Sequence, residues 1–489
     1  MLGESKTNAF AALDTFLALA LAFIAAYARL WTVAWPTIIT FDEVHFGNFT
    51  KWYVVGDFHF DIHPPLGKLM MAHISKLGGY RGEIADFSKL GRQYHMNETA
   101  YISLRMIPAI FSSICSPLLY SCARLLYIDP FPAFASTLLV TFDISMIVES
   151  KFILSDGMLH FWFAFHLFTF CLFLRHGGEH RAILAGITIG CAGACKFTAL
   201  SVYAIDGITQ VIWILLRWPN IIKIITRGCA LLIPSFIAMY LAWLWHFAST
   251  PYKGYHAHYM NAADIHTVLE REKINTSYWG NRVSDSPLLL RIIRWNIVMN
   301  RVNMRSKIPH PWESRPQYWP LLMDKYVLFH HGKENRRIHC MGLPASYWIS
   351  TASLILTFPL LLCRRASWQN LLFVWSWAVS FIPFLGVPRT MFHYHYLLPL
   401  MCATLNTAAL LHFMFKDNIK ARSFACALIA LLTFLCYLFF SPWAYGTKCP
   451  NCDQTRHWLS RWNRGPPKPV YDFGRQLFNT TKRYGKLPL

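Results

Sequence analysis

Residues 41–47 read FDEVHFG and residues 63–68 read HPPLGK, and both motifs lie between long hydrophobic blocks. Asp42 and Glu43 are adjacent carboxylates in a chain that holds 25 acidic residues against 46 Lys and Arg. Ionisable groups beside a membrane-length segment are costly to retain and usually have a function. A solvated acidic loop is the alternative interpretation. The concentration of acids at this point of an acid-poor chain favours a functional site.

The composition is typical of a membrane protein. Of the 489 residues, 55% are hydrophobic and only 15% are charged, whereas a soluble protein carries about 25% charged residues. The hydrophobic residues form blocks separated by short polar links, which predicts an all-α polytopic membrane protein. The net charge of +21 is compatible with nucleic-acid binding. However, the basic residues lie between hydrophobic blocks instead of forming one stripe, so no nucleic-acid partner is expected.

The hydrophobic blocks are interpreted as about eleven transmembrane helices in the lipid bilayer. They cover approximately residues 10–31, 101–119, 131–148, 156–174, 182–195, 197–216, 230–247, 346–363, 370–387, 396–415 and 424–443. The first block is interpreted as a retained signal anchor, because no basic region with a cleavage site precedes it. Links rich in Lys and Arg fall on one side of the membrane in this arrangement, so the positive-inside rule places the N-terminus in the cytosol.

This topology divides the chain into four parts. Residues 1–250 form a membrane core of about seven spans, which includes a first lumenal loop at 32–100. A second lumenal loop at 251–345 separates this core from four C-terminal spans at 346–443. Residues 444–489 form a basic lumenal tail. Three candidate N-glycosylation sites fall on the lumenal side in this topology, at Asn97, Asn275 and Asn479.

The 13 cysteines give one local signal. Ten of them lie inside hydrophobic segments and are interpreted as small buried apolar residues. Cys449 and Cys452 flank a Pro-Asn pair, and they can form a local disulfide if the tail faces an oxidising lumen. A single CxxC pair is a weak zinc signal, so no metal site is predicted.

Several ionisable side chains are expected to converge with Asp42 and Glu43 on the lumenal face. They are His63, Lys68, Lys151, Asp156, Lys196, Arg389 and His395. A phosphate ligand would explain basic residues on the lumenal side, through charge-assisted hydrogen bonds. The alternative is that each basic side chain extends to lipid headgroups. A carboxylate beside a phosphate site suits group transfer from a lipid phosphate, with the carboxylate as general base and the cations stabilising the leaving group. No metal is required.

These motifs resemble those of the protein O-mannosyltransferases. FDEVHFG at 41–47 and DIHPPLGK at 61–68 resemble the first lumenal loop of that family. RTMFHYHYLLP at 389–399 resembles its late Arg…His-Tyr…Pro motif. Further matches, in the order of the family, are SRPQYWPL at 314–321, GLP at 342–344 and Lys196 with Phe197.

The resemblance implies a GT-C-type fold in the endoplasmic reticulum membrane. It implies dolichyl phosphate mannose as donor and Ser or Thr hydroxyls of secretory and membrane proteins as acceptors, with no further cofactor. Asp42 would be the general base of an inverting transfer, and Glu43 would orient the donor or the acceptor. Lys151 stands where the family has an important arginine, and it keeps the charge without the bidentate fork. His393 stands where the family usually has an aliphatic residue.

Further expectations concern the second loop and a partner. The loop at 251–345 is too short for the MIR domain that eukaryotic family members usually carry, so no MIR domain is expected. The family commonly works as dimers, which implies a homodimer or a heterodimer with another family member. The Trp- and His-rich segment 309–320 is expected to pack over the active site, unless its tryptophans are plain interfacial anchors.

Two alternative functions use the same features. Another dolichyl-phosphate-sugar transferase of the GT-C type could act on a glycan or glycolipid, and the acid loop alone does not exclude it. The HPPLGK and RTMFHYHYLLP motifs favour a protein acceptor. A membrane transporter or flippase predicts inverted repeats and broken helices near the midplane. No such repeat is found in the sequence, and the ionisable residues cluster at one face.

Overall fold

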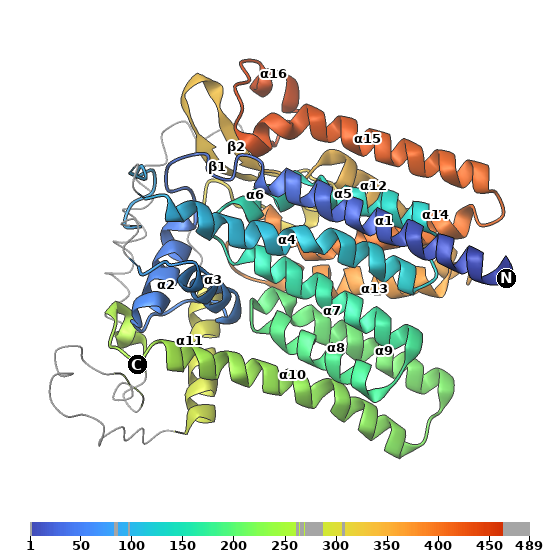
Figure 1. Ribbon diagram of the computed structural model, residues 1–489, viewed down its shortest axis with the longest axis horizontal. Coiled ribbons are helices and arrows are strands. Elements are labelled where there is room, and N and C mark those ends of the chain that lie inside the picture. The colour runs from blue at the N-terminus through green and yellow to red at the C-terminus, as the bar shows by residue number, and fades with distance from the viewer. Residues whose placement is uncertain are drawn as a thin grey trace.

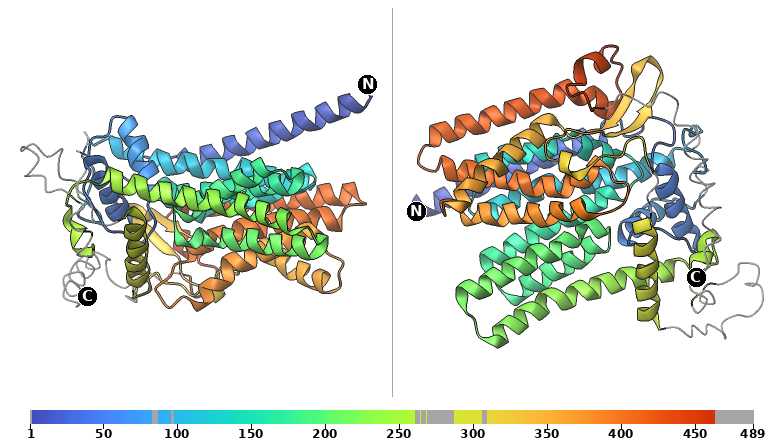
Figure 2. Two further views of the ribbon diagram at one scale, coloured as in Figure 1. Left: turned by 90° about the horizontal axis from the view of Figure 1, so that it is seen from below. Right: turned by 180° about the vertical axis from the view of Figure 1, so that it is seen from behind.

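The structure is a computed structural model, and it describes residues 2–82, 87–95, 98–260, 264, 268, 287–305 and 309–462. Long helices run side by side, and the shorter elements gather at one end, at the left in Figure 1. The two views of Figure 2 show the same separation. We call this end the loop end. It contains α2 (Glu43–Val55), α3 (Leu66–Leu77), α11 (Leu288–Arg305), α16 (Cys452–Arg456), β1 (Val327–His331) and β2 (Arg337–Cys340).

Nine of the described helices are long and apolar enough to cross a membrane, judged by length and composition. They are α1 (Leu2–Leu30), α4 (Ala100–Leu125), α7 (Asp156–His176), α9 (Ser201–Arg217) with the 3-10 turn η1 (Phe197–Leu200), α10 (Ile221–Ser249), α12 (Pro344–Leu362), α13 (Trp368–Phe381) with η7 (Ile382–Gly386), α14 (Leu397–Met414) with η8 (His393–Tyr396), and α15 (Ile419–Tyr445). The predicted all-α membrane class is confirmed.

A tenth candidate span is a bent pair of helices, α5 (Pro130–Thr141) and α6 (Ile144–Lys151), which meet at 54°. Asp143 lies at the bend, where the sequence predicted a continuous span. Its Oδ1 accepts a hydrogen bond from Met146 N at 3.0 Å, and its Oδ2 accepts one from Leu343 N at 2.8 Å. A carboxylate at membrane depth needs such partners, so Asp143 caps α6 and fixes the start of α12.

The short predicted span at 182–195 is α8 (Glu179–Gly193). With 15 residues it is about 22 Å long, which is less than the roughly 30 Å of a bilayer core. A Cβ at Gly186 would lie 2.4 Å from Leu231 O, and one at Gly190 would lie 2.2 Å from Ser235 O. The glycines therefore allow the backbones of α8 and α10 to touch, as small residues do in membrane bundles. The count of eleven spans depends on α8 and stays a prediction.

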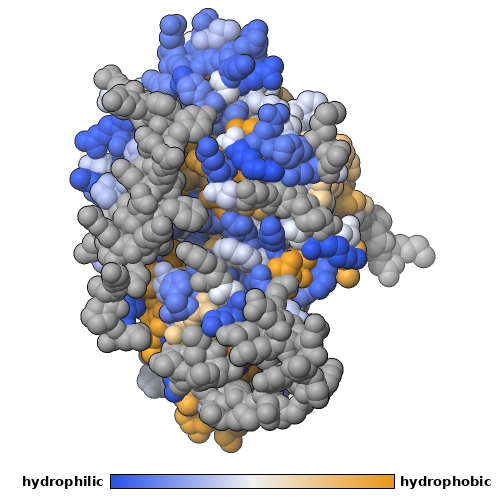
Figure 3. Space-filling view, turned by 90° about the vertical axis from the view of Figure 1, so that its left-hand side faces the viewer, coloured by the Kyte–Doolittle hydropathy of each residue, from blue (hydrophilic) through white to orange (hydrophobic). Residues whose placement is uncertain are grey.

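The surface of the long helices is apolar, and that of the loop end is polar. Large side chains on α10 and α15 are exposed, including Phe236 at 61% and Phe424 at 71%. Exposed apolar residues in such numbers indicate contact with lipid. Seen from the loop end, the described surface is largely hydrophilic (Figure 3). The hydrophilic surface of the loop end is thus distinct from the apolar surface along the sides of α10 and α15.

The β1–β2 hairpin is the described β-structure at the loop end. Its strands are antiparallel, with Val327 opposite Cys340. The turn between them contains η6 (Lys333–Asn335), and the other short turns are η2 (Tyr255–Tyr259) and η5 (Pro316–Tyr318). Cys449 and Cys452 form a disulfide next to the hairpin. The three candidate glycosylation sites and residues 463–489 of the tail lie outside the described residues.

Candidate functional site

Glu43 begins α2, and its carboxylate is occupied by groups of the protein itself. Oε1 accepts from Arg105 Nε at 2.7 Å and from Ile153 N at 3.1 Å. Oε2 accepts from Arg105 Nη2 at 2.8 Å and from Thr40 N at 3.0 Å. Both charged side chains are fully buried. Arg105 also donates to Pro36 O at 2.8 Å. The pair therefore fixes the loop before α2 against α4 and the end of α6.

Asp42 differs from its neighbour. It is partly exposed, and within the described part of the chain its side chain makes no capping hydrogen bond to α2. Partial burial raises the pKa of Asp42, and repulsion from Asp156 and Asp61 raises it further, whereas His45 and Lys196 favour the ionised form. An accessible carboxylate with a raised pKa has the properties of a general base.

Lys196 and Asp156 form an ion pair close to this carboxylate. Lys196 Nζ lies 2.9 Å from Asp156 Oδ1, and both side chains are buried. Asp156 begins α7, and Lys196 directly precedes η1. Lys196 Nζ also lies 5.7 Å from the ring centre of Tyr394. The Tyr394 ring is 6.4 Å from that of Phe41, the residue before Asp42. Tyr394 thus joins the 389–399 motif to the first loop.

Arg389 brings a guanidinium and a contact with α11 to the same site. It forms a hydrogen bond to Asn303 Oδ1 on α11 and donates to Thr390 O at 3.2 Å. Burial lowers the pKa of Arg389, and attraction to Tyr394 and Asp42 opposes that shift. The guanidinium of Arg389 and the carboxylate of Asp42 therefore interact electrostatically. Asp42, Asp156, Lys196 and Arg389 thus interact electrostatically, and their roles in a reaction stay predictions.

His395 is covered by the segment 309–320. Its Nδ1 lies 2.8 Å from Phe392 O, which favours the tautomer with the proton on Nδ1. The Trp319 ring stacks on His395 at 6.1 Å between ring centres. Trp319 Nε1 donates to Ser314 Oγ at 2.8 Å, and Ser314 N donates to Met391 O at 2.9 Å. The segment is therefore attached to the 389–399 motif rather than free at an interface.

In the HPPLGK motif, the side chain of Lys68 is bound by neighbouring groups of the same loop. Lys68 forms an ion pair with Asp61 and donates to His63 O at 2.8 Å. Burial lowers the pKa of His63 well below its usual range, and Lys196 and Lys68 add to that effect. His63 is therefore neutral near pH 7 and can serve a phosphate as a hydrogen-bond donor, not as a cation. The ammonium of Lys68 already has partners within the turn.

The ammonium of Lys151 contacts a different set of elements. Its Nζ donates to Thr32 Oγ1 at 2.9 Å and to Ala444 O at 3.4 Å, and it lies 4.5 Å from the ring centre of Tyr445. These contacts connect the end of α6 to the ends of α1 and α15. The phosphate role expected for Lys151 stays a prediction, and it would require the ammonium to leave its protein partners.

Four residues of the site were given no role in the sequence analysis, although Asp61 and Tyr394 lie inside the motifs quoted there. They are Asp61, Arg105, Asn303 and Tyr394, and they hold Lys68, Glu43, Arg389 and Phe41 respectively. One signal was present, because Arg105 lies inside a predicted span, where an arginine needs a partner. No comparable signal marked Asn303, whose partner is far away in the sequence.

Comparisons with known proteins place the chain in a family. The sequence profile described as "Dolichyl-phosphate-mannose-protein mannosyltransferase" matches residues 19–252. The profile described as "C-terminal four TMM region of protein-O-mannosyltransferase" matches residues 288–462. The chain belongs to the protein O-mannosyltransferase family. The resemblance drawn from the motifs is confirmed.

Named family members are similar to this chain over part of their length. Dolichyl-phosphate-mannose–protein mannosyltransferase 4 of Schizosaccharomyces pombe is 30% identical over 197 residues, which are 39% of this chain and 25% of that protein. Dolichyl-phosphate-mannose–protein mannosyltransferase 1 of Saccharomyces cerevisiae is 28% identical over 274 residues, or 53% of this chain and 33% of that one. The matched part thus spans a quarter to a third of these relatives.

Solved structures of two kinds share the fold. The protein O-mannosyltransferase Pmt1-Pmt2 complex of S. cerevisiae, bound to the sugar donor, superposes with a TM-score of 0.82 at 18% identity, over 92% of this chain and 93% of that chain. The oligosaccharyltransferase of Archaeoglobus fulgidus in its apo form has a TM-score of 0.50 at 15% identity, over 97% and 60%. The GT-C-type fold expected from the motifs is confirmed.

Proposed function

We propose that this protein transfers mannose from dolichyl phosphate mannose to Ser or Thr hydroxyls of secretory and membrane proteins. One observation carries the proposal: Asp42 is accessible and near Lys196 and Arg389, while the adjacent Glu43 is held by Arg105. Family membership supports this donor. The yeast complex of the same fold, which is bound to the sugar donor, supports it as well.

In the proposed reaction, Asp42 accepts the proton of the acceptor hydroxyl while the oxygen attacks C1 of mannose. The bond from C1 to the phosphate oxygen breaks, dolichyl phosphate leaves with the electron pair, and the configuration at C1 inverts. Lys196 and Arg389 stabilise the charge that develops on the phosphate. Glu43 acts through its contacts with Arg105 as a positioning residue. The reaction requires no cofactor besides the donor.

The proposed location is the endoplasmic reticulum membrane, with the loop end in the lumen. We expect a dimer with another family member, and the two-protein composition of the yeast complex supports that expectation. Only residues 253–287 separate the two matched regions, which supports the expectation that no MIR domain lies between them. Acceptor selection would then depend on the loop end and on the partner subunit.

The test uses membranes that contain the protein, radiolabelled dolichyl phosphate mannose and a Ser/Thr-rich peptide. Wild type is compared with Asp42→Asn and with Glu179→Gln, which removes an exposed carboxylate at the opposite end of the bundle. We expect alkali-labile mannose on the peptide with wild type and Glu179→Gln only, and unchanged donor binding by Asp42→Asn. Transfer by Asp42→Asn would remove Asp42 as the base. Mannose on a glycolipid but not on the peptide would favour the alternative acceptor class.

A further inference from the structure

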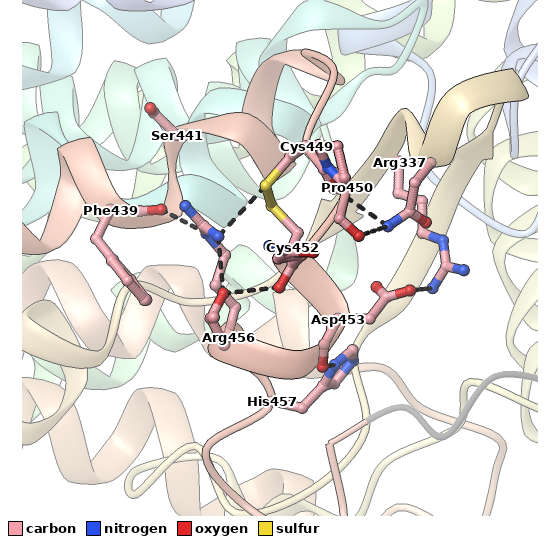
Figure 4. The surroundings of a disulfide bond; sticks show 12 residues. Arg337, Phe439, Ser441, Cys449, Pro450, Cys452, Asp453, Arg456 and His457 are labelled. Atoms are coloured by element: carbon pink, nitrogen blue, oxygen red, sulfur yellow. Dashed lines mark hydrogen bonds and ion pairs between the residues drawn. A yellow bond between two sulfur atoms is a disulfide. The ribbon is translucent and has the colours of Figure 1, made fainter.

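The disulfide at the loop end is asymmetric in its exposure. Cys449 and Cys452 follow α15 and are joined across Pro450 and Asn451 (Figure 4). Cys449 is partly exposed, and the two residues between the cysteines are exposed. Cys452 is only 1% exposed. Attack on a disulfide requires access to a sulfur, so the difference in residue exposure favours attack by an external thiol at Cys449 over attack at Cys452.

The guanidinium of Arg456 lies beside the sulfur of the partly exposed Cys449. Arg456 Nη1 donates to Cys449 Sγ at 3.4 Å, and Arg456 Nε donates to Phe439 O at 2.6 Å. The guanidinium also lies 4.4 Å from the ring centre of Phe439, so three contacts hold its position (Figure 4). An arginine next to a sulfur, within a CxxC pair, stabilises the thiolate and makes it a better leaving group.

Cys340 on β2 can be compared with Cys449, because both lie at the loop end. Its thiol is buried, and burial together with nearby Glu149 raises the pKa of Cys340. A thiol in that environment is inert towards exchange. The surroundings of Cys449 differ from those of Cys340 in both exposure and charge.

The segment that contains the disulfide also contacts the β1–β2 hairpin, and this hairpin packs against Phe41 of the first loop. Asn335 Nδ2, in the hairpin turn, donates to Cys449 O at 3.2 Å. Arg337 on β2 forms an ion pair of 2.8 Å with Asp453 on α16 (Figure 4). On β1, the Phe329 ring lies 4.5 Å from that of Phe41. A continuous set of contacts thus runs from the disulfide through the hairpin to the residue before Asp42.

We propose that Cys449–Cys452 is a thiol-exchange site. Its reduction increases the local opening of the β1–β2 hairpin, which packs against Phe41. A thiolate of a small thiol such as glutathione attacks Cys449 Sγ. The S–S bond breaks, and its electron pair goes to Cys452 Sγ, which takes a proton from water. A second thiolate attacks the external sulfur of the mixed disulfide, and Cys449 leaves as a thiolate beside Arg456. The pair is reduced by two electrons, and two thiols are oxidised to one disulfide.

The first test maps the exchange in the purified full chain. Wild type is equilibrated with glutathione couples of defined ratio, quenched in acid, alkylated and analysed by mass spectrometry. We expect the Cys449–Cys452 pair to be reduced in the folded protein while Cys340 stays unmodified. With glutathione disulfide, Cys452→Ser should form a mixed disulfide at Cys449 at least about tenfold faster than Cys449→Ser forms one at Cys452. Equal rates, or a pair reduced only after unfolding, would overturn the exchange site.

The second test measures the link to the hairpin by amide hydrogen exchange in wild type, oxidised and reduced. We expect faster exchange over residues 327–340 after reduction and unchanged exchange over α4. Unchanged exchange over the hairpin would overturn the coupling. Neither test measures mannose transfer, so their failure is distinct from a failure of the proposed function.

Discussion

Arg105 binds Glu43 through two hydrogen bonds, of 2.7 and 2.8 Å, where α4 meets the start of α2. Both side chains are fully buried. The preceding residue, Asp42, is partly exposed. Two carboxylates that are adjacent in sequence are therefore placed in different environments, which is how a protein gives two chemically identical groups separate roles. Glu43 holds the loop, and Asp42 is available to the substrate.

Glu43→Gln should destabilise the protein as well as stop transfer. The variant leaves Arg105 as an unpaired buried charge, which costs about 3–5 kcal/mol. Asp42→Asn breaks no such pair and should change the free energy of unfolding by less than about 0.5 kcal/mol. Thermal unfolding in detergent, measured beside transfer, separates the two variants. Adding Arg105→Met to Glu43→Gln should recover part of the stability but not the transfer. A Glu43→Gln variant that is inactive yet as stable as wild type would instead assign Glu43 a direct contact with substrate.

The pH dependence of transfer should report the environment of Asp42. The base acts when ionised, so activity is lost as the pH falls through the pKa of Asp42, which is raised above the usual value for Asp. His45 favours the ionised form, and it is exposed on α2. His45→Gln should therefore raise the pKa of Asp42 and move the acid limb of kcat/KM to higher pH. His180→Gln, exposed at the other end of the bundle, should leave the profile unchanged. A shift to lower pH in His45→Gln would contradict Asp42 as the titrating base.

The helices were predictable from sequence because each span is a local property of its own apolar block. The site was predictable only where motifs mark it. The partner of Glu43 lies 62 positions away at Arg105, and no periodicity connects them. Lys151 was grouped with Asp156 because both flank the start of a predicted span and because Lys151 stands where the family has an arginine. In the structure α6 ends at Lys151, and the ammonium of Lys151 contacts Thr32, so its phosphate role stays a prediction. The contact with Thr32 joins residues 119 positions apart, and no local pattern of the sequence marks it.

Lys196 should contribute to the transition state through its charge. Lys196→Ala should lower kcat/KM by about 10²–10³-fold, the usual effect of removing one charge-stabilising donor, and Lys196→Arg should retain more activity. Because Lys196 favours the ionised form of Asp42, the alanine variant should also move the acid limb to higher pH. Lys76→Ala, an exposed lysine on α3, is the matched control. An alanine variant with an unchanged rate and profile would place the phosphate elsewhere.

Lys151 should act on stability rather than on the donor. Its ammonium is used by Thr32 Oγ1, Ala444 O and the ring of Tyr445. Lys151→Met removes these contacts and leaves the hydroxyl and carbonyl without their donor, so the free energy of unfolding should fall by about 1–3 kcal/mol. The KM for dolichyl phosphate mannose should stay unchanged, since no phosphate contact is lost. Thr32→Val, which removes the hydroxyl partner alone, should show a smaller loss of the same kind. A raised donor KM at unchanged stability would contradict this and restore the role that the family resemblance implies for position 151.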